Sequence, residues 1–303
     1  MFRYVLAALA LKGFSCSPFT KRLYRSLGNT LGAKKRSSGP MPQSYLRRVN
    51  RMLRLNRRYS ILRGGERLLE IGTGWLHWEA LTCRLFFDVQ GVLYDVWDNR
   101  QMSGLKNYIT QLDGMLKNLD SEEPQLERAH RLIVEIQKAK EFRDLYRLLG
   151  FKYLVDPTGS LKQFEGASFN IVASAGVLEH IHANIASEFV DRIANILKPG
   201  GYSFHSINLQ DHLFHYDRTV SVKQYLRYSE RTWKRWFEND VQYINKIQRP
   251  DWLALFNKAG LDLVEEEVEI EDISGLKVAK AYQMYGKCDL RCCFLRLLHR
   301  KPQ

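Results

Sequence analysis

From residue 66 onward, short apolar runs alternate with longer segments whose apolar residues recur every three or four positions. The short runs have the length of β-strands, and the longer segments have the period of helices that bury one face. We expect strands at 67–71, 91–94, 153–155, 169–174, 202–207, 261–270 and 292–298, and helices at 76–87, 185–197 and 252–258. This alternation predicts an α/β fold with a mostly parallel seven-stranded sheet and helices on both of its faces.

Two segments interrupt the alternation. Residues 100–149 keep a helical period throughout, with a new start at Pro124, and we interpret them as an inserted helical hairpin. Residues 208–250 follow the fifth expected strand, and we expect them to cover a substrate. The sequence therefore predicts one large domain over residues 66–303, preceded by a separate segment over residues 1–65.

The segment 1–65 reads as a basic, partly helical arm. Its apolar run, Val5 to Leu11, is too short to cross a bilayer, which takes about 20 residues. The run is either a first helix, on the surface or packed in the core, or the centre of a signal peptide, although no A-x-A-like cleavage site follows it. We expect a loop at residues 28–42, rich in Gly, Ser, Lys and Pro, and then an amphipathic helix at 45–62 with arginines on one face.

Charge divides the chain in the same way. The net charge is +13, yet residues 1–65 carry 15 Lys and Arg and no Asp or Glu, and residues 287–303 carry a further excess of four positive charges. The body between them is therefore mildly acidic. A basic arm of this kind indicates an anionic partner, such as a membrane surface or nucleic acid, or docking on the acidic body itself.

Cysteine usage indicates a reduced protein without a metal. The five cysteines are odd in number and lack the paired C-x2-C spacing of a zinc site. We expect buried thiols, a cytosolic location and no bound metal ion.

A ligand site is predicted where the first strand ends. Gly72, Thr73 and Gly74 form a turn there, and glycines allow a backbone to pass close to a ligand. Asp95 ends the second strand, 21 residues after Gly74, where a carboxylate can accept both ribose hydroxyls. His77 replaces the third glycine of a dinucleotide site. A nucleoside cofactor without a pyrophosphate therefore fits better.

Three motifs in order resemble the class I S-adenosylmethionine-dependent methyltransferases. The resemblance is strong over residues 66–210 and looser elsewhere. Its motifs are Glu70-x-Gly72-x-Gly74, the segment 168–181 with its Leu-Glu-His ending, and the turn Leu197-Lys198-Pro199-Gly200-Gly201. A narrower likeness, carried by residues 72–75, 95–100 and 207–212, is to a bacterial subgroup often associated with cell-surface glycan genes.

The resemblance implies a Rossmann-like fold and S-adenosylmethionine as cofactor. It implies that Glu70, Gly72, Thr73 and Gly74 bind the methionine end and that Asp95 binds the ribose. It also implies that Asp156, after the third strand, lies near the adenine amino group, and that Ala175 and Gly176 line the floor beside the sulfonium.

Three histidines are candidate bases for a methyl acceptor that must lose a proton. His180 follows the fourth strand, and its alternative role is to cap the local turn. His212 follows the fifth strand, and the adjacent Asp211 could orient its imidazole or stabilise the loop. His205 lies inside a strand and is expected to be a buried core residue.

We therefore expect a cytosolic methyltransferase, free or peripheral to a membrane, that methylates a small-molecule or glycan-type acceptor at oxygen. The Asn/Asp-Pro-Pro-Tyr/Phe motif that serves exocyclic amines is absent, which disfavours nucleobases as acceptors. Two alternatives stay open: an RNA methyltransferase that uses the basic arm, and a non-catalytic assembly protein that retains the fold.

Overall fold

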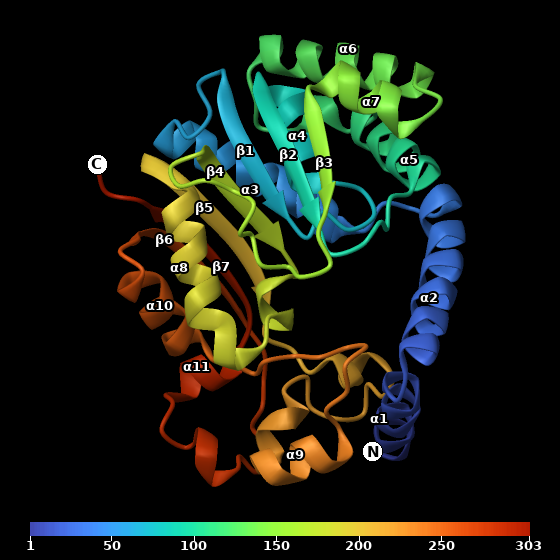
Figure 1. Cartoon of the computed structure of the whole chain (residues 1–303), viewed down its shortest axis with the longest axis vertical. Helices are drawn as coiled ribbons and strands as arrows, with labels where there is room; N and C mark the ends of the chain where they lie inside the picture. The colour runs from blue at the N-terminus through green and yellow to red at the C-terminus, as the bar shows by residue number, and fades with distance from the viewer. The chain divides into compact units, whose positions relative to one another are not determined.

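A computed structural model describes residues 1–303 and shows a seven-stranded sheet (Figure 1). The strand order is β3-β2-β1-β4-β5-β7-β6. The strands are β1 (Glu66–Ile71), β2 (Val89–Asp95), β3 (Phe151–Val155), β4 (Phe169–Ala175), β5 (Leu197–Asn208), β6 (Asp262–Ile270) and β7 (Cys292–Arg300). β1 pairs in parallel with β2 and β4, β2 pairs in parallel with β3, and β6 and β7 are antiparallel. The predicted Rossmann-like fold is confirmed.

The chain forms eleven α-helices, which include the expected ones after β1, after β4 and before β6. They are α1 (Phe2–Ser15), α2 (Pro18–Ser38), α3 (Gln43–Tyr59), α4 (Trp78–Phe86), α5 (Met102–Asp113), α6 (Glu123–Lys138), α7 (Phe142–Leu149), α8 (Ala186–Ile196), α9 (Glu230–Trp236), α10 (Arg249–Lys258) and α11 (Lys287–Arg291). None of them combines the length with the apolar composition that a bilayer crossing demands.

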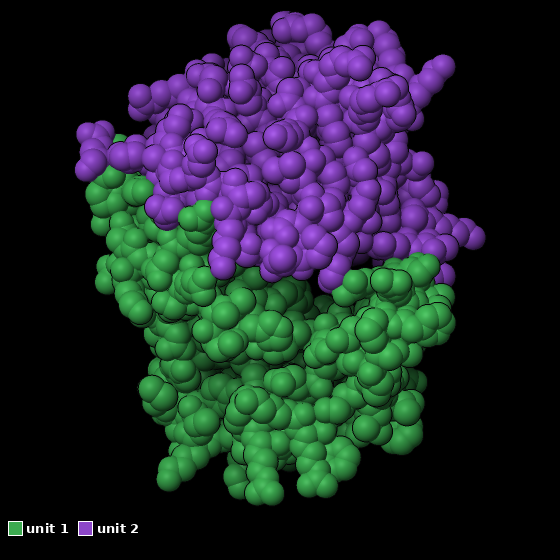
Figure 2. Space-filling view, in the orientation of Figure 1, with its two compact units in different colours: residues 1–27, 176–194, 204–302 green, residues 28–175, 195–203, 303 purple.

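The chain divides into two compact units, coloured separately in Figure 2. Unit 1 comprises residues 1–27, 176–194 and 204–302, and unit 2 comprises residues 28–175, 195–203 and 303. Each unit is described by itself below.

Unit 2 contains β1 to β4 and the inserted helices. β1 is buried from Leu68 to Ile71, as expected for a central strand that is covered on both faces. The predicted helical insertion is confirmed as α5, α6 and α7, which lie together between β2 and β3 in the chain (Figure 1). α6 begins with a capping box at Glu122 and has a proline in its first turn, which explains the new start at Pro124.

Unit 1 has a core of its own, and α1 is part of it. Tyr4, Ala8 and Leu11 are buried in an apolar cluster with Leu213, Tyr225, Leu226, Trp233 and Phe237. The ammonium group of Met1 and the backbone N–H of Tyr4 both donate to the carboxylate of Asp217, at 2.6 and 3.2 Å. The apolar run at residues 5–11 is therefore the core-packed helix that we considered.

The prediction of a loop at residues 28–42 was wrong for most of that segment. α2 continues to Ser38, and only the residues from Gly39 to Pro42 separate it from α3. Gly28 and Gly32 each lower helix stability by about 1 kcal/mol relative to alanine, but this cost did not end the helix. Gly and Ser content alone was a poor guide here.

Candidate functional site

The backbone bend after β1 is built from two glycines with positive φ. Gly72 has φ +65° and Gly74 has φ +58°, the left-handed region that favours glycine. The N–H of Gly72 donates to the carbonyl of Tyr94 at 2.7 Å, and the N–H of Gly74 donates to Oδ2 of Asp95 at 2.8 Å. The glycine turn and the end of β2 therefore lie together in unit 2, as the sequence predicted.

Asp95 is the last residue of β2 and is only 5% exposed. Its Oδ1 accepts the N–H of Val96 at 2.7 Å, while Oδ2 is held by Gly74. Burial raises the pKa of Asp95, and the backbone N–H groups oppose that rise. Besides Gly74 and Val96, the backbone N–H of Trp97 and the hydroxyl of Thr73 also lower the pKa of this carboxylate, so several donors fix its orientation.

The turn leaves room for a ligand. A Cβ placed on Gly74 would meet no atom closer than the Gly72 carbonyl oxygen at 4.0 Å, so the backbone here faces open space. An oriented carboxylate beside an open glycine turn suits a nucleoside with two neighbouring hydroxyls. S-adenosylmethionine has such a ribose, so these residues fit the predicted cofactor.

Asp156 follows β3 and joins the same network. Its N–H donates to the carbonyl of Asp95 at 2.9 Å, and its Oδ2 accepts the hydroxyl of Tyr94 at 2.9 Å. The hydroxyl and N–H of Thr158 donate to Oδ1, and these bonds lower the pKa of Asp156. The Asp156 carboxylate is thus ionised and held at the ends of two neighbouring strands.

Glu70 and Thr73 are buried within the turn and the strand before it. Oε2 of Glu70 accepts the N–H of Ala80, in the first turn of α4, at 2.8 Å. Burial raises the pKa of Glu70 well above its ordinary value, and the nearby carboxyl of Glu79 adds to the rise. Thr73 donates its N–H to the carbonyl of Tyr94 at 3.4 Å. Glu70 therefore secures the helix that follows the turn, and its contact with a methionine ammonium group stays a prediction.

His77 has a structural role in this site that was not evident from its position in the sequence. It has φ +50°, and its ring is buried among Phe142, Tyr146 and Tyr153, with ring centroids 5.7 to 5.8 Å away. Nε2 of His77 is hydrogen-bonded to the Tyr146 hydroxyl at 2.9 Å. Burial, followed by the nearby charge of Arg100, lowers the pKa of His77 to about 3. The inserted α7 thus packs against the turn that follows β1.

In unit 1, the segment after β4 begins at Gly176, which has φ +70° and donates its N–H to the carbonyl of Ser206 at 2.9 Å. Ala175, the last residue of β4, is half-buried in unit 2. Leu178–His180 forms a 3₁₀ turn, and the exposed His180 donates from Nδ1 to the carbonyl of Tyr243 at 2.6 Å. In the neutral ring this bond leaves the lone pair on Nε2 of His180.

His212 lies close to His180. The two ring centroids are 5.1 Å apart, with the rings nearly at right angles. Burial, followed by the nearby His180 and His215, lowers the pKa of His212 to about 3. The Asn208 amide Nδ2 lies 3.5 Å from Nε2 of His212, and the N–H of Gln210 donates to Oδ1 of Asn208, which fixes how that amide points. His212 is therefore a neutral imidazole at neutral pH.

Asp211 does not orient His212, contrary to one of our two hypotheses for it. Its Oδ2 accepts the hydroxyl of Tyr4 at 2.6 Å, and its Oδ1 accepts the N–H of Leu213 at 2.9 Å. Burial raises the pKa of Asp211 to about 7. Because both oxygens hold α1 and the local turn, Asp211 has the loop-stabilising role, and His180 and His212 remain the candidates for acceptor chemistry.

His205 is a core residue, as predicted. It is fully buried in β5, and its ring lies 5.4 Å from that of Phe256.

Glu179 is the residue of this cluster that the sequence reasoning missed. It stands between Leu178 and His180, is 2% exposed, and accepts the N–H of Asn208 at Oε1 over 3.2 Å. Its Oε2 is buried and has no hydrogen-bond partner. Burial raises the pKa of Glu179. The Leu-Glu-His sequence could have drawn attention to it, since a carboxylate next to a candidate histidine is a chemical signal.

Comparison with known proteins identifies the fold family. The family described as "Methyltransferase domain" matches residues 22–266. No significant match to a curated protein sequence was found.

Several solved structures are similar to this chain at low identity. An S-adenosylmethionine-dependent methyltransferase of Methanosarcina mazei is 10% identical, with a TM-score of 0.47, over 81% of this chain and 97% of that one. The 1,6-didemethyltoxoflavin-N1-methyltransferase of Burkholderia thailandensis is 14% identical, with a TM-score of 0.46, over 86% and 79% of the two chains. Phosphoethanolamine N-methyltransferase 2 of Haemonchus contortus is 16% identical, with a TM-score of 0.45; 84% of this chain aligns with only 52% of that protein.

Proposed function

Because this chain belongs to the methyltransferase-domain family, it is an S-adenosylmethionine-dependent methyltransferase, and we propose that it methylates a hydroxyl group of a small-molecule or glycan-type acceptor. The cofactor supplies a methyl group on a positively charged sulfur. Asp95 and the turn at Gly72 to Gly74 hold its nucleoside, with Asp156 toward the adenine and Glu70 and Thr73 toward the methionine end. Ala175 and Gly176, at the end of β4, lie beside the sulfur.

The observation that carries the acceptor proposal is the pair of imidazoles in unit 1, 5.1 Å apart. Methyl transfer is a displacement, so most of its acceleration comes from positioning. A hydroxyl acceptor must also lose its proton, which calls for a group that takes or stabilises that proton. His180 and His212 follow β4 and β5 in the chain, after the strand ends where ligands of such sheets bind.

The acceptor class rests on sequence. Residues 174–177, Ser-Ala-Gly-Val, stand where methyltransferases of exocyclic amines have an Asn/Asp-Pro-Pro-Tyr/Phe motif. The likeness at residues 72–75, 95–100 and 207–212 to a glycan-associated bacterial subgroup supports a sugar-type hydroxyl. Residues 208–250 would then cover the acceptor.

The proposal is tested with S-adenosylmethionine that carries a labelled methyl group. Purified protein is incubated with small-molecule and glycan fractions of a bacterial extract, and labelled products are analysed for base-stable methyl ethers. We expect His180→Ala and His212→Ala to lower transfer by roughly 100-fold or more while cofactor affinity is unchanged. The matched control is His182→Ala, an exposed histidine two residues from His180. Label found only in methylamines or nucleic acid would refute hydroxyl transfer.

We also propose that the protein docks on an anionic membrane surface through α1 and the first half of α2. Phe19, Leu23 and Leu27 are exposed and four residues apart, so they share one face of α2, and Phe2 and Leu6 are exposed on α1. Residues 1–65 contain no acidic side chain. Exposed apolar residues among basic ones favour an interfacial helix at an anionic lipid surface.

Sedimentation with phosphatidylglycerol vesicles tests the membrane proposal. Each phenylalanine contributes about 1.5 kcal/mol or more when it is buried in lipid, so Phe2→Ser with Phe19→Ser should weaken binding by roughly 100-fold. Met284, which is 81% exposed in unit 1, provides the control Met284→Ser. Equal binding of the double variant and the control, or equal binding to neutral vesicles, would refute this docking surface.

A further inference from the structure

Three side chains of unit 1 form a cluster with the composition of a metal site. One carboxylate oxygen of Glu179 and one ring nitrogen each of His180 and His212 lie within 4.8 Å of one another. The residues come from two segments, the 3₁₀ turn after β4 and the turn after β5, so the fold brings the cluster together. Our sequence reasoning expected no metal because it considered only the cysteines.

A second observation points to a missing partner at the same place. Oε2 of Glu179 accepts no hydrogen bond from the protein. Because the residue is only 2% exposed, bulk water does not supply one either. A buried carboxylate oxygen without a donor is costly, and native structures rarely leave one without a partner, such as an ordered water or an ion. A cation bound to Oε2 would provide that partner.

The surrounding hydrogen bonds hold these groups as ligands are usually held. His180 donates from Nδ1 to the carbonyl of Tyr243 at 2.6 Å, which leaves Nε2 free to bind an ion. Oε1 of Glu179 is held by the N–H of Asn208. Metal-binding histidines almost always donate their other N–H to a carbonyl or carboxylate, which fixes the ring.

We propose that Glu179, His180 and His212 bind a divalent transition-metal ion of the Zn²⁺ type. Two imidazoles and a carboxylate suit such an ion, whereas Ca²⁺ and Mg²⁺ prefer oxygen ligands throughout. In a tetrahedral site the donor atoms would be roughly 3.3 Å apart, so the three ligands would move closer together when an ion binds. Three protein ligands leave a fourth position open for an exogenous oxygen.

The metal site would also assist the proposed hydroxyl methylation. This role in the reaction rests on the proposed function, whereas metal binding does not. An ion held by Glu179, His180 and His212 would offer its open position to the acceptor hydroxyl, lower the pKa of that hydroxyl and let its proton pass to water. In the methyl transfer itself, a C–O bond forms as the S–CH₃ bond breaks. The products are a methyl ether and S-adenosylhomocysteine. His180 and His212 then act as ligands rather than as free bases.

The binding test needs neither cofactor nor acceptor. Chelator-treated full-length protein is titrated with Co²⁺, a stand-in for Zn²⁺ whose visible absorption reports its ligands, and with Zn²⁺ by calorimetry. We expect one equivalent to bind, a visible band that reports nitrogen ligands, and a rise of the thermal unfolding midpoint with Zn²⁺. His180→Ala and His212→Ala should each weaken binding by roughly 100-fold or more, and Glu179→Gln should weaken it as well.

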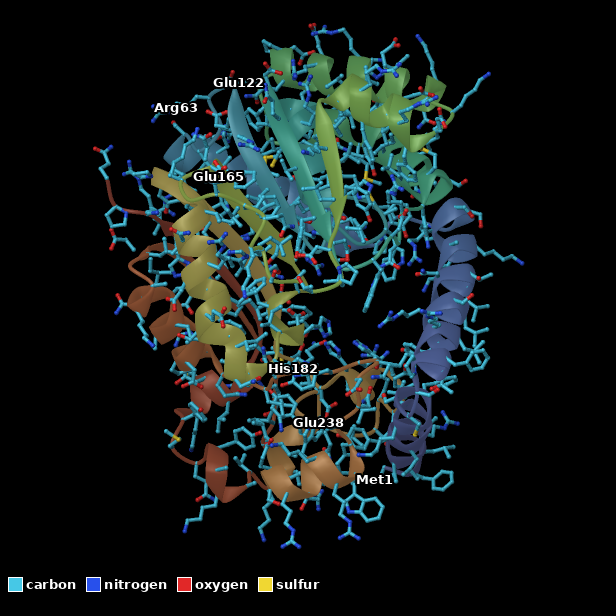
Figure 3. All side chains as sticks on the ribbon, viewed as in Figure 1. Met1, Arg63, Glu122, Glu165, His182 and Glu238 are labelled. Atoms are coloured by element: carbon cyan, nitrogen blue, oxygen red, sulfur yellow. The ribbon has the colours of Figure 1, made fainter.

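His182→Ala is the matched control, because His182 is exposed on the same segment (Figure 3) and is not part of the cluster. It should bind Co²⁺ as the unmodified protein does. Thermal unfolding of each metal-free variant separates a lost ligand from a lost fold. Failure of the unmodified protein to bind Co²⁺, or equal binding by His180→Ala and His212→Ala, would overturn the site. Binding without hydroxyl transfer would leave the site in place and refute only its role in the reaction.

Discussion

Replacement of Asp95 by alanine is the most direct test of the cofactor site. Asp95 is held by the N–H groups of Gly74 and Val96, so its two oxygens are aimed before any ligand arrives. A nucleoside with two neighbouring hydroxyls would donate both of them to this carboxylate. Asp95→Ala removes both of these charge-assisted bonds and also the acceptor that holds the glycine turn.

The size of the effect follows from these bonds. A hydrogen bond to a charged group contributes about 1.5 to 3 kcal/mol, so the loss of two should cost about 3 to 6 kcal/mol of binding free energy. The dissociation constant should therefore rise by roughly 10² to 10⁴. Asp95→Asn keeps the shape and one acceptor oxygen, and its loss should be roughly half of this in free energy.

Calorimetric titration with S-adenosylhomocysteine measures the affinity directly. Asp98→Ala is the matched control, since Asp98 lies three residues away and its half-exposed carboxylate pairs with Arg100. Circular dichroism and thermal unfolding establish that each variant is folded. A folded Asp95→Ala that binds within about threefold of the unmodified protein, or an Asp98→Ala that loses as much, would refute the proposed ribose contact.

Three further predictions concern the groups that support the site. Tyr4→Phe leaves a buried oxygen of Asp211 without a donor and should lower the free energy of unfolding by about 1 to 3 kcal/mol in urea titrations; no change would refute that role. The pKa of His77 lies near 3, below its ordinary 6.5, so its stabilising contribution is complete above pH 6.5 and is lost as the pH falls toward 3. His77→Asn should thus flatten the decline of unfolding free energy in that window by up to about 1.4 kcal/mol per pH unit, and an unchanged slope would count against it. In Gly74→Ala the methyl group has space but the backbone φ is unfavourable, so the free energy of unfolding should fall by about 1 kcal/mol. Cofactor binding should weaken by more than this. An unaltered affinity in calorimetry would contradict the idea that the cofactor fills the space over Gly74.

The order of strands and helices could be predicted because the local pattern of apolar residues indicates most of these elements. β1 and β2 are recognisable as short apolar runs, and Gly74 and Asp95 mark their ends with residue types that a turn and a ligand require. Where local composition was ambiguous, prediction failed. Gly28 and Gly32 suggested a loop, yet the helix α2 passes through both. The glycine cost of about 1 kcal/mol each is small, so glycine content alone does not distinguish a helix from a loop.

The orientation of side chains in unit 1 could not be predicted for a different reason. Asp211 and His212 are neighbours in sequence, which suggested that one orients the other. The decisive partner of Asp211 is Tyr4, which is 207 residues away and is brought there by the docking of α1. For Glu179, the sequence offered only its place beside His180. The unpartnered oxygen that makes it a candidate ligand can be seen only in the structure.

Two features of unit 2 explain each other: the histidine at position 77 and the inserted helix α7. His77 stands where a dinucleotide site has a third glycine, and it adopts a left-handed conformation that costs a non-glycine residue about 1 to 2 kcal/mol. The insertion supplies Phe142 and Tyr146, which bury the imidazole and hydrogen-bond to its Nε2. Packing against these aromatic side chains offsets part of the strain, although Nδ1 of His77 is buried without a hydrogen-bond partner. Because α7 supplies these contacts, we infer that the insertion stabilises the turn at Gly74 by holding the His77 ring in place.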